Sequence, residues 1–519
     1  MKKTLTVNLG GTVFHIDEDA YQLLDKYLAN LRIHFRKEEG SEEIMNDFEM
    51  RISELFNERV RLGYEVITIE HVEEVIKRMG KPEELFEGEE EKEYKADEVL
   101  DLAHHAVVPG FIDGHMHTGD AILRGLAQDT NNWMMFGLQP FENAVTHEDR
   151  VAGSRMALLE AVKSGTTTLG DYWHDMDEAC AFIDKVGARG NITQLVRAAK
   201  QKVYKPGELY EFDDAMGEES LAKNIALYDK WHNKANGRIK ILFGPQGVDF
   251  LSIDLLKKTQ AVVKERNTLM HIHVQQGDRE TYQIVKRYGK RPVELMRDIE
   301  LLDERIIAVH LTDCTEEEAA MVARTGASMI VNPGSIAIID GIVCPSVAFQ
   351  EAGGNCALGS DQAPGNNCHN IFNEMKNVAL FNKIKFQNPE VMPAWRALRM
   401  ATIEGARAVG LGDVTGSLEA GKEADFIAID LNKPTMLPVF TNPMRNIVPN
   451  IVYSARGEEV ALSAVQGKVI YRDGEFTNVD YRDYFGEVNK HTEDIGKRAK
   501  KEFDEINGTN SRFMKEGKL

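Results

Sequence analysis

Between residues 105 and 412 the chain alternates short β-like runs with helical runs, and this alternation limits the possible folds more than any other feature. The β-like runs are eight: 106–113, 166–171, 191–199, 238–244, 268–275, 305–310, 328–332 and 356–361. In the helical run 147–163, Thr146 and Asp149 stand as a capping box and Gly165 lies just past the end. Eight β-then-α units predict a (β/α)₈ TIM barrel of the α/β class over residues 99–412.

An open, doubly wound sheet is the alternative interpretation of the same alternation. Such sheets often carry a glycine-rich phosphate-binding loop after a strand. Neither GxGxxG nor GxxxxGK[ST] follows any of the eight runs, so no nucleotide-binding motif supports this alternative.

The predicted barrel is flanked by segments of different character. Residues 1–82 predict an N-terminal α+β domain, with a hairpin that turns at Gly10-Gly11 and helices that are apolar on one face. Residues 83–98 hold nine acidic and two basic side chains, which is typical of a solvated linker. Runs at 424–430, 450–455 and 459–471 predict strands of a small β-sandwich over 413–480, and the tail 481–519 is charged and helix-prone.

Composition excludes several classes of protein. The formal net charge is −21, so the chain should be repelled by nucleic acid phosphates and by anionic lipid. No apolar run approaches 18 residues and the N-terminus has no signal-peptide pattern, so we expect neither a membrane span nor secretion. The five cysteines are scattered, with no CxxC pair, which favours reduced thiols and a cytoplasmic location.

Histidine and aspartate stand where several predicted strands end. His115 and His117 follow the first run, and side chains two apart on a strand point to the same face. His273, His310 and Asp361 end the fifth, sixth and eighth runs. The carboxyl ends of barrel strands meet at one mouth, and imidazoles with a carboxylate suit a divalent ion such as Zn²⁺. The pattern therefore predicts a metal site, although each residue alone could be structural.

These motifs resemble the amidohydrolase superfamily. The resemblance spans about residues 97–480 and rests on VVPGFIDGHMHT, LRGLAQD, SGTTT, HIHV, VHLTD, LGSDQAP and ATIEGARAVGLGDVTGSLEAGKEADFIAIDL. The most similar branch comprises deaminases and ring hydrolases that act on S-adenosylhomocysteine, cytosine, guanine and triazines. The resemblance implies that His115, His117, His273 and Asp361 hold one Zn²⁺ or Fe²⁺ per chain. It also implies catalytic roles for Asp361, as the base, and for His310, which would polarise the reacting group.

Two positions depart from the deaminase branch. That branch usually has a glutamate three residues after the strand-five histidine, where this chain has Gln276, and an amide cannot take up a proton at neutral pH. A strand-four histidine is replaced by Gln246. Loops after barrel strands shape the substrate pocket. We therefore expect five polar or aromatic residues near the mouth to bind substrate: Trp173, His174, Gln276, Ser335 and Asn366.

The flanking domains fit the superfamily less well. Members normally place sandwich strands ahead of the HxH motif, and the stretch before it here is short and charged. Either the 3–16 hairpin completes the sandwich or the sandwich stays partial. Residues 1–82 instead resemble the segment that precedes PspC-type membrane stress domains, so the chain could be a fusion.

Three hypotheses follow for the function. The first is a metal-dependent hydrolase of C–N bonds that deaminates a nitrogen heterocycle. The second is a hydrolase of cyclic amides or ring substituents with Asp361 as its sole base, which Gln276 favours. The third is a non-catalytic barrel that binds a ligand. In each case we expect a small-molecule ligand, and the resemblance implies a homo-oligomer.

Overall fold

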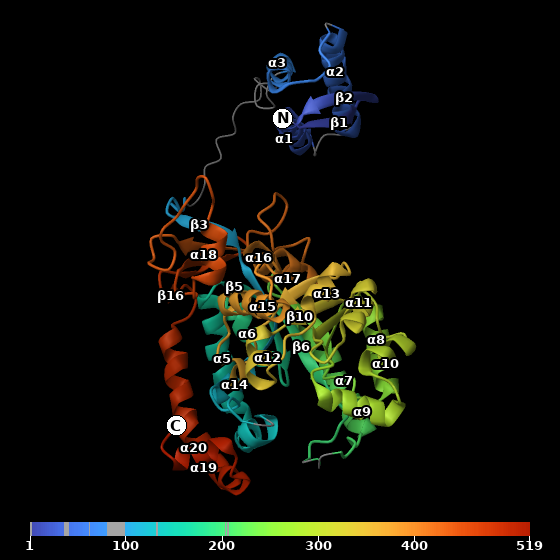
Figure 1. Ribbon diagram of the computed structural model, residues 1–519. Helices are drawn as coiled ribbons and strands as arrows, with labels where there is room; N and C mark the ends of the chain where they lie inside the picture. The colour runs from blue at the N-terminus through green and yellow to red at the C-terminus, as the bar shows by residue number, and fades with distance from the viewer. Residues whose placement is uncertain are drawn as a thin grey trace. The chain divides into compact units, whose positions relative to one another are not determined.

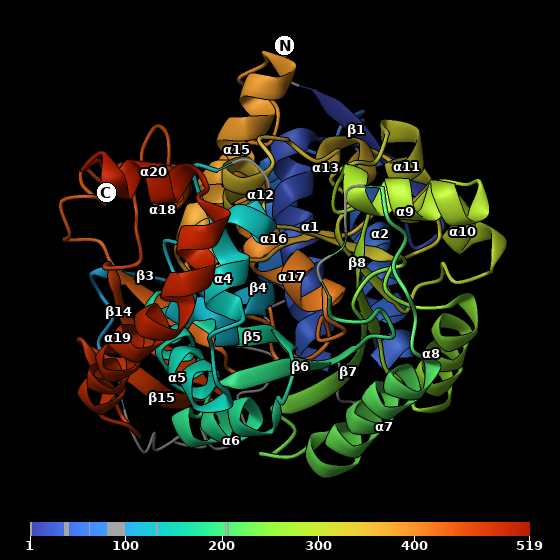
Figure 2. The ribbon, with the colours of Figure 1, turned by 90° about the horizontal axis from the view of Figure 1, so that it is seen from below.

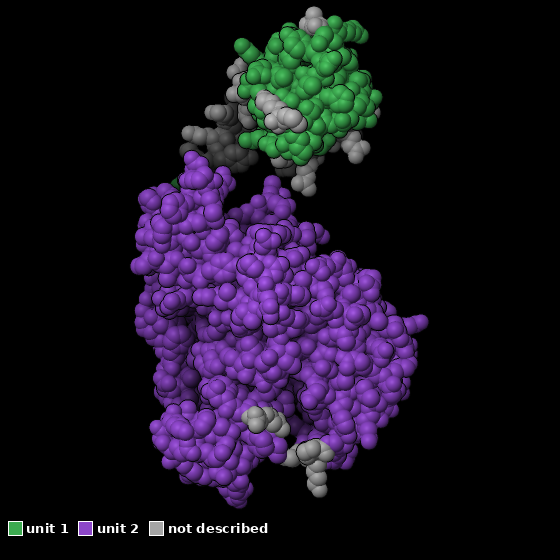
Figure 3. All heavy atoms as spheres, viewed as in Figure 1, with its two compact units in different colours: residues 1–100 green, residues 101–519 purple. Residues whose placement is uncertain are grey.

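The computed structural model describes residues 3–35, 41–61, 63–79, 99–130, 133–202, 204 and 207–519. The chain packs as two compact units, residues 1–100 and 101–519 (Figure 3). The predicted acidic linker, 83–98, lies outside the described residues. Within those described ranges, no helix combines the length and the apolar character that crossing a bilayer requires.

The first unit is a small α+β domain with its own core. Strands β1 (Thr4–Leu9) and β2 (Thr12–Asp17) form the predicted antiparallel hairpin, and Gly10 and Gly11 turn it with φ of 52° and 80°. Three helices follow: α1 (Glu18–Phe35), α2 (Ser41–Arg61) and α3 (Ile69–Met79). Their apolar faces and the hairpin enclose one buried cluster, which includes Phe14, Ile16, Leu24, Leu31, Ile52, Phe56 and Val72.

The second unit is built around a parallel sheet that closes into a barrel. Its strands, in order along the chain, are β4 (Phe111–His117), β5 (Thr166–Trp173), β6 (Arg189–Val196), β7 (Ile239–Pro245), β8 (Met270–Val274), β9 (Ile306–His310), β10 (Ser328–Val331), β11 (Cys356–Leu358) and β12 (Asp361–Gln362). Each strand pairs in parallel with its neighbour, from β11 at one end of the order to β12 at the other. Because β11 and β12 are successive pieces of one stretch, the two ends of the sheet meet. The predicted TIM-like barrel is confirmed.

Helices cover the outside of this barrel, as α5 to α8 show along β5, β6 and β7 in Figure 2. The main ones are α5 (His147–Lys163), α6 (Asp177–Val186), α7 (Asp214–Trp231), α8 (Ile253–Glu265), α9 (Asp278–Tyr288), α10 (Pro292–Asp298), α11 (Glu316–Arg324), α13 (Ser346–Glu351), α15 (Ile371–Phe386), α16 (Ala394–Ala401) and α17 (Ile403–Ala408). Short elements stand near the mouth: η1 (Thr118–Leu123), η2 (Met134–Leu138), α4 (Gln139–Glu142), α12 (Pro333–Ile339) and α14 (Ala363–Asn366). The capping box of Thr146 and Asp149 at the start of α5 is present.

A second, antiparallel sheet has the order β16-β15-β14-β13-β3. Its strands are β3 (His105–Pro109), β13 (Phe426–Asp430), β14 (Val460–Val465), β15 (Lys468–Arg472) and β16 (Glu475–Phe476). The prediction of a single barrel strand over 106–113 was therefore wrong. The chain changes sheet at Gly110, where a Cβ would overlap the side chain of Thr167, so only glycine allows this close crossing. The strand β3, and not the 3–16 hairpin, supplies the N-terminal edge of this sheet.

The strand predicted at 450–455 is also wrong, because residues 447–453 form helix α18 (Ile447–Tyr453). Pro449 lies in the first helical turn, where the absent N–H costs no hydrogen bond, and Ile451 and Val452 are buried. Packing against the barrel thus overrides the β propensity of isoleucine and valine. The tail forms α19 (Tyr481–Ile506) and α20 (Thr509–Lys515), near the C-terminus in Figure 1.

One buried ion pair joins the two sheets. Arg189, at the start of β6, is 1% exposed and donates from Nε to Asp425 Oδ2 at 2.8 Å and from Nη2 to Glu423 Oε2 at 2.6 Å. Asp425 also accepts from the backbone N–H of Gln466 at 2.8 Å. The segment before β13 is thereby fixed to the barrel.

Candidate metal centre

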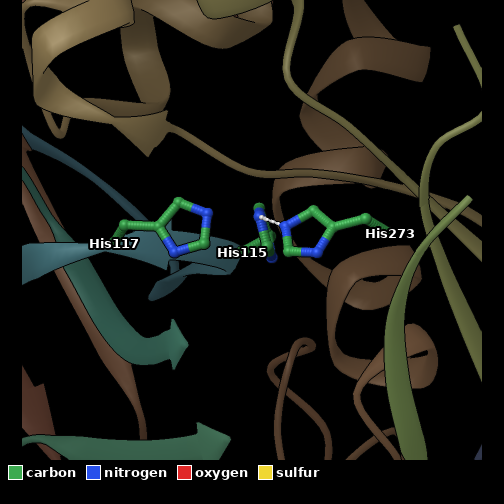
Figure 4. Close-up of side chains that lie close together, drawn as sticks. All are labelled: His115, His117 and His273. Carbon is green, nitrogen blue, oxygen red and sulfur yellow. Dashed lines mark hydrogen bonds between the residues drawn. The ribbon is translucent and has the colours of Figure 1, made fainter. Parts of the chain in front are cut away.

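The five residues predicted at strand ends lie together at the barrel mouth. His115 and His117 come from β4, His273 from β8, His310 from β9 and Asp361 from β12, and all five are buried. Within each of the triplets His115–His117–His273 and His115–His310–Asp361, the potential ligand atoms lie within 4.8 Å of one another. Figure 4 shows the first triplet, with the rings of His117 and His273 approaching His115 from opposite sides.

Hydrogen bonds fix which ring nitrogen faces the centre. His117 Nδ1 donates to the carbonyl of Tyr172 at 2.5 Å, and His273 Nδ1 donates to the carbonyl of Gln246 at 2.5 Å. A carbonyl only accepts, so in the neutral rings Nε2 carries a lone pair. His273 Nε2 lies 3.2 Å from His115 Nε2. Two of these inward nitrogens are thus electron-pair donors, as a metal ligand must be.

A carboxylate completes the set. Asp361 Oδ1 lies 3.3 Å from His117 Nε2 and 3.7 Å from His115 Nε2, while Asp361 Oδ2 accepts from Ser335 Oγ at 2.6 Å. Asp361 has a φ of 60°, a left-handed conformation that is uncommon outside glycine. Strain of this kind persists where the surroundings impose one geometry, and it concentrates at functional sites.

The electrostatics of the centre combine an ionised carboxylate with imidazoles whose pKa values differ. Burial, together with the neighbouring imidazoles, places the pKa of His115 and of His273 well below the ordinary value. Burial also opposes protonation of His117, but the hydrogen bond and charge of Asp361 raise its pKa overall. Burial would raise the pKa of Asp361, yet His117, His310 and Ser335 lower it. The ionised carboxylate and the neutral imidazoles of His115 and His273 fit the nitrogen and oxygen ligands that Zn²⁺ prefers, and His117 would release its proton on binding the ion.

His310 differs from the other three histidines. Asn332 Nδ2 donates to His310 Nδ1 at 3.0 Å, so in the neutral ring the proton sits on Nε2. Nε2 is buried and has no hydrogen-bond partner among the described residues. Burial lowers the pKa of His310 to about 4, which keeps the ring neutral. His310 therefore presents an N–H donor to the centre.

The residues expected to bind substrate lie at different depths. Trp173 ends β5 with its ring centroid 5.1 Å from that of His117, and the exposed His174 follows it. Gln276 is half-buried, and its backbone N–H donates to Glu280 Oε2 at 3.1 Å. Ser335 contacts Asp361, as above. Asn366 is buried behind the centre, where its amide donates to the carbonyls of Ser360 at 2.7 Å and Cys368 at 3.1 Å.

His271 was not predicted as a site residue, although its position in the sequence carries a signal. His271 and His273 are two apart on β8 and therefore share a face, as in the HxH motif. His271 Nε2 lies 2.9 Å from His115 Nδ1, and its Nδ1 lies 2.8 Å from Thr193 Oγ1. It thus orients the ring of His115, a role that supporting residues commonly have around metal ligands.

Charged residues at the mouth were missed as well. Arg150 forms an ion pair with Asp120, lies 3.7 Å from Glu142 Oε1 and stands 5.7 Å from the ring centroid of Trp173. Burial and the charge of Asp120 raise the pKa of Glu142 to about 7. Glu280 is also buried, and burial together with Asp249 raises its pKa to about 8. Nothing in the sequence pattern distinguishes these residues from ordinary surface charges.

Comparisons with known proteins agree with this architecture. The model of the Amidohydrolase family matches residues 106–470. A 5-methylthioadenosine/S-adenosylhomocysteine deaminase from Thermoanaerobacter pseudethanolicus is 32% identical over 413 residues, which cover 79% of this chain and 92% of that protein. A 5'-deoxyadenosine deaminase from Methanosarcina mazei is 31% identical over 406 residues, covering 78% and 90% of the two chains.

Solved structures of other proteins are also similar to this chain. An adenosine deaminase from Xanthomonas campestris with bound zinc is similar with a TM-score of 0.69 and 26% identity, over 76% of this chain and 86% of that one. An atrazine chlorohydrolase from Arthrobacter aurescens shares the fold, with a TM-score of 0.66 and 18% identity over 75% and 88% of the two chains. On the match of the family model and of these relatives, the chain belongs to the Amidohydrolase family and is a hydrolase that acts on carbon–nitrogen bonds.

Proposed function

We propose that this protein hydrolytically deaminates a nitrogen heterocycle, with one Zn²⁺ held by His115, His117, His273 and Asp361. The observation that carries the proposal is that His117, His273 and Asp361 all lie close to His115, while Nδ1 of His117 and of His273 bonds to a carbonyl outside the centre. The bound zinc of the Xanthomonas campestris structure favours Zn²⁺ over Fe²⁺. When bound, such an ion lowers the pKa of a coordinated water to about 7 and so supplies a nucleophile at neutral pH.

We propose an adenine nucleoside, or a form modified at the 5′ position, as the substrate, because the relatives named above act on such compounds. In the reaction the oxygen of water bonds to the ring carbon that carries the amino group. The C–N bond then breaks, and the amino nitrogen leaves as ammonia with one proton from the water. The ring keeps the oxygen as an oxo group, and the second proton of the water ends on the adjacent ring nitrogen, so atoms balance.

Two residues of the centre would move or hold protons. Asp361 is ionised and lies in the centre, so it can accept the proton of water and return it to the leaving nitrogen. His310 Nε2–H has no other partner and can donate a hydrogen bond to the charge that develops on the attacked ring. Trp173, Ser335 and Gln276 would orient the substrate or Asp361, and Asn366 would support the Asp361 loop from behind.

The alternative, hydrolysis of a cyclic amide or ring substituent with Asp361 as sole base, is favoured by one observation. Gln276 stands where related deaminases usually have a proton-carrying glutamate, and its amide cannot carry a proton at neutral pH. Ammonia release distinguishes deamination from hydrolysis of a cyclic amide or ring substituent. With the purified chain and a panel of adenosine, 5′-deoxyadenosine, 5′-methylthioadenosine and S-adenosylhomocysteine, we expect stoichiometric ammonia and the corresponding inosine product. A panel that yields no ammonia, while a cyclic amide is opened, favours the alternative.

Replacing Gln276 with glutamate tests how far this position limits deamination. If proton transfer to the ring is slow, Gln276→Glu should raise kcat for ammonia release at least about tenfold, because a positioned acid contributes 10²–10⁴-fold. Gln276→Met is the control, since it has similar length and no proton to transfer. A fall in kcat with both substitutions would instead assign the glutamine amide a binding role of its own.

Other features of the chain remain predictions. We propose that residues 1–82 are a separate domain, that the tail 481–519 follows a C-terminal sheet segment, and that the protein forms a homo-oligomer in the cytoplasm. The resemblance of residues 1–82 to the segment ahead of PspC-type domains is a prediction of the same kind.

A further inference from the structure

The C-terminal helices lie on a loop that follows the first barrel strand. This mouth loop, residues 124–130 and 133–146, begins after η1 and leads to α5. Helix α19 runs beside α4 and α5 (Figure 2). Its buried residues Val488 and Ile495 share one apolar cluster with Ile122, Leu123, Ala127, Leu138 and Ala152. The loop thus packs between the barrel and the C-terminal helix.

Polar contacts fix α19 to the end of the loop. Arg498 Nε donates to the carbonyl of Ala144 at 2.7 Å, and its guanidinium pairs with Asp149. His491 Nδ1 lies 2.6 Å from Asp149 Oδ1. Asp149 is the capping-box residue that closes the first turn of α5 on Thr146. Thr146, next to α5 in the sequence, and Arg498 and His491, from the distant helix α19, all contact Asp149. Together these contacts determine where α5 begins.

Further contacts join the tail helices to the mouth loop along its length. Asn143 Nδ2 donates to Glu502 at 3.0 Å, and the rings of Phe141 and Phe503 lie 5.4 Å apart. Beyond α19, Asn510 Nδ2 reaches the carbonyls of Leu126 and Gln128, both at 3.4 Å. The tail contacts the loop at both of its ends.

The end of the mouth loop and the first turn of α5, which α19 contacts, carry charged side chains at the barrel mouth. Glu142 ends α4, and Arg150 follows Asp149 directly. Arg150 pairs with Asp120, lies 3.7 Å from Glu142 and faces the ring of Trp173, which contacts His117. Arg150, Trp173 and His174 line one pocket. A shift of the first turn of α5 would move this wall of the pocket relative to the metal centre.

We infer that the tail helices α19 and α20 are a strap that sets the substrate-binding wall, with Arg498 and His491 as positioning residues acting through Asp149. The inference rests on the proposed function, because the wall matters for catalysis only if a substrate binds there. The metal ligands come from β4, β8 and β12, and none of the tail contacts described above involves them. Loosening the strap should therefore affect substrate binding and leave the metal in place.

The test compares Arg498→Ala with Lys501→Ala, an exposed position on the same helix. For Arg498→Ala we expect kcat/KM for the best adenine nucleoside to fall about 10-fold to 10²-fold, mainly through KM, because small displacements of positioning groups cost this much. Arg498→Lys, which keeps the charge, should recover part of the loss. Metal content should stay at the wild-type level, and Lys501→Ala should behave as wild type.

Hydrogen exchange provides a readout that does not need turnover. Amides of residues 133–156 should exchange faster in Arg498→Ala than in Lys501→Ala. Faster exchange with unchanged kcat/KM would show that the strap has only a structural role. A fall in kcat/KM without faster exchange would show that the effect does not pass through the mouth loop. Either result overturns the inference. A wild-type chain that releases no ammonia contradicts the proposed function and leaves the strap to be tested by exchange alone. In that case, equal exchange rates in Arg498→Ala and Lys501→Ala would overturn the inference about the strap.

Discussion

Asparagine in place of Asp361 should reduce ammonia release about 10²-fold to 10⁴-fold, the range that a positioned acid–base group contributes. The substitution keeps the size of the side chain and an oxygen that can accept from Ser335. It removes the negative charge that lies 3.3 Å from His117 Nε2, and with it the one carboxylate of the two ligand triplets found among the described residues. The chain therefore loses both its proton acceptor and one anionic ligand. Initial rates with the best nucleoside, measured at saturating Zn²⁺, give the size of the effect.

Asp340→Asn is the matched control for this experiment. Asp340 is a half-buried carboxyl at the end of α12 whose pKa is raised to about 6 by burial and by the charge of Asp361. Its loss changes the charge near the mouth without touching the cluster, so turnover should stay close to that of wild type. Full turnover in Asp361→Asn would place the base elsewhere. Glu280, whose buried Oε1 has no hydrogen-bond partner within the described part of the chain, would be the next carboxyl to replace.

The second large effect concerns stability. Methionine in place of Arg189 should lower the free energy of unfolding of the barrel unit by about 3–5 kcal/mol, the usual cost of removing one partner of a buried ion pair. Asp425 is fully buried and would lose its partner Nε of Arg189. Chemical denaturation monitored by tryptophan fluorescence reports on this unit, because all four tryptophans of the chain lie in it.

Arg305→Met is the comparison for the stability measurement. Arg305 pairs with its neighbour Glu304 at the surface, and such pairs contribute at most about 1 kcal/mol. A loss for Arg189→Met as small as that for Arg305→Met would contradict the view that the ion pair fixes the small sheet to the barrel.

Some of this architecture follows directly from the sequence. The alternation of β-like and helical runs predicts the barrel, because each buried parallel strand needs a helix to return the chain. Side chains at the carboxyl ends of such strands converge, so His115, His117, His273, His310 and Asp361 could be grouped although up to 246 positions separate them. The turn residues Gly10 and Gly11 were equally informative, because they predicted the hairpin that the structure has.

Other parts depend on contacts that no local pattern contains. The division of 106–113 between two sheets follows from the close approach of Gly110 to Thr167. Helix α18 forms because Ile451 and Val452 find a buried surface. The roles of Arg150 and Arg498 arise from partners 30 and 349 positions away, Asp120 and Asp149. Long-range pairs of this kind are set by tertiary packing, which one sequence does not display.

The metal content of the purified chain tests the central claim most directly. Elemental analysis after purification in metal-replete buffer, compared between wild type and a His117→Ala, His273→Ala double variant, measures whether these side chains hold an ion. We predict about one divalent metal ion per wild-type chain, as a three-imidazole and carboxylate set implies, and almost none in the variant. A wild-type chain that binds no metal, or a variant that keeps it, would contradict the account.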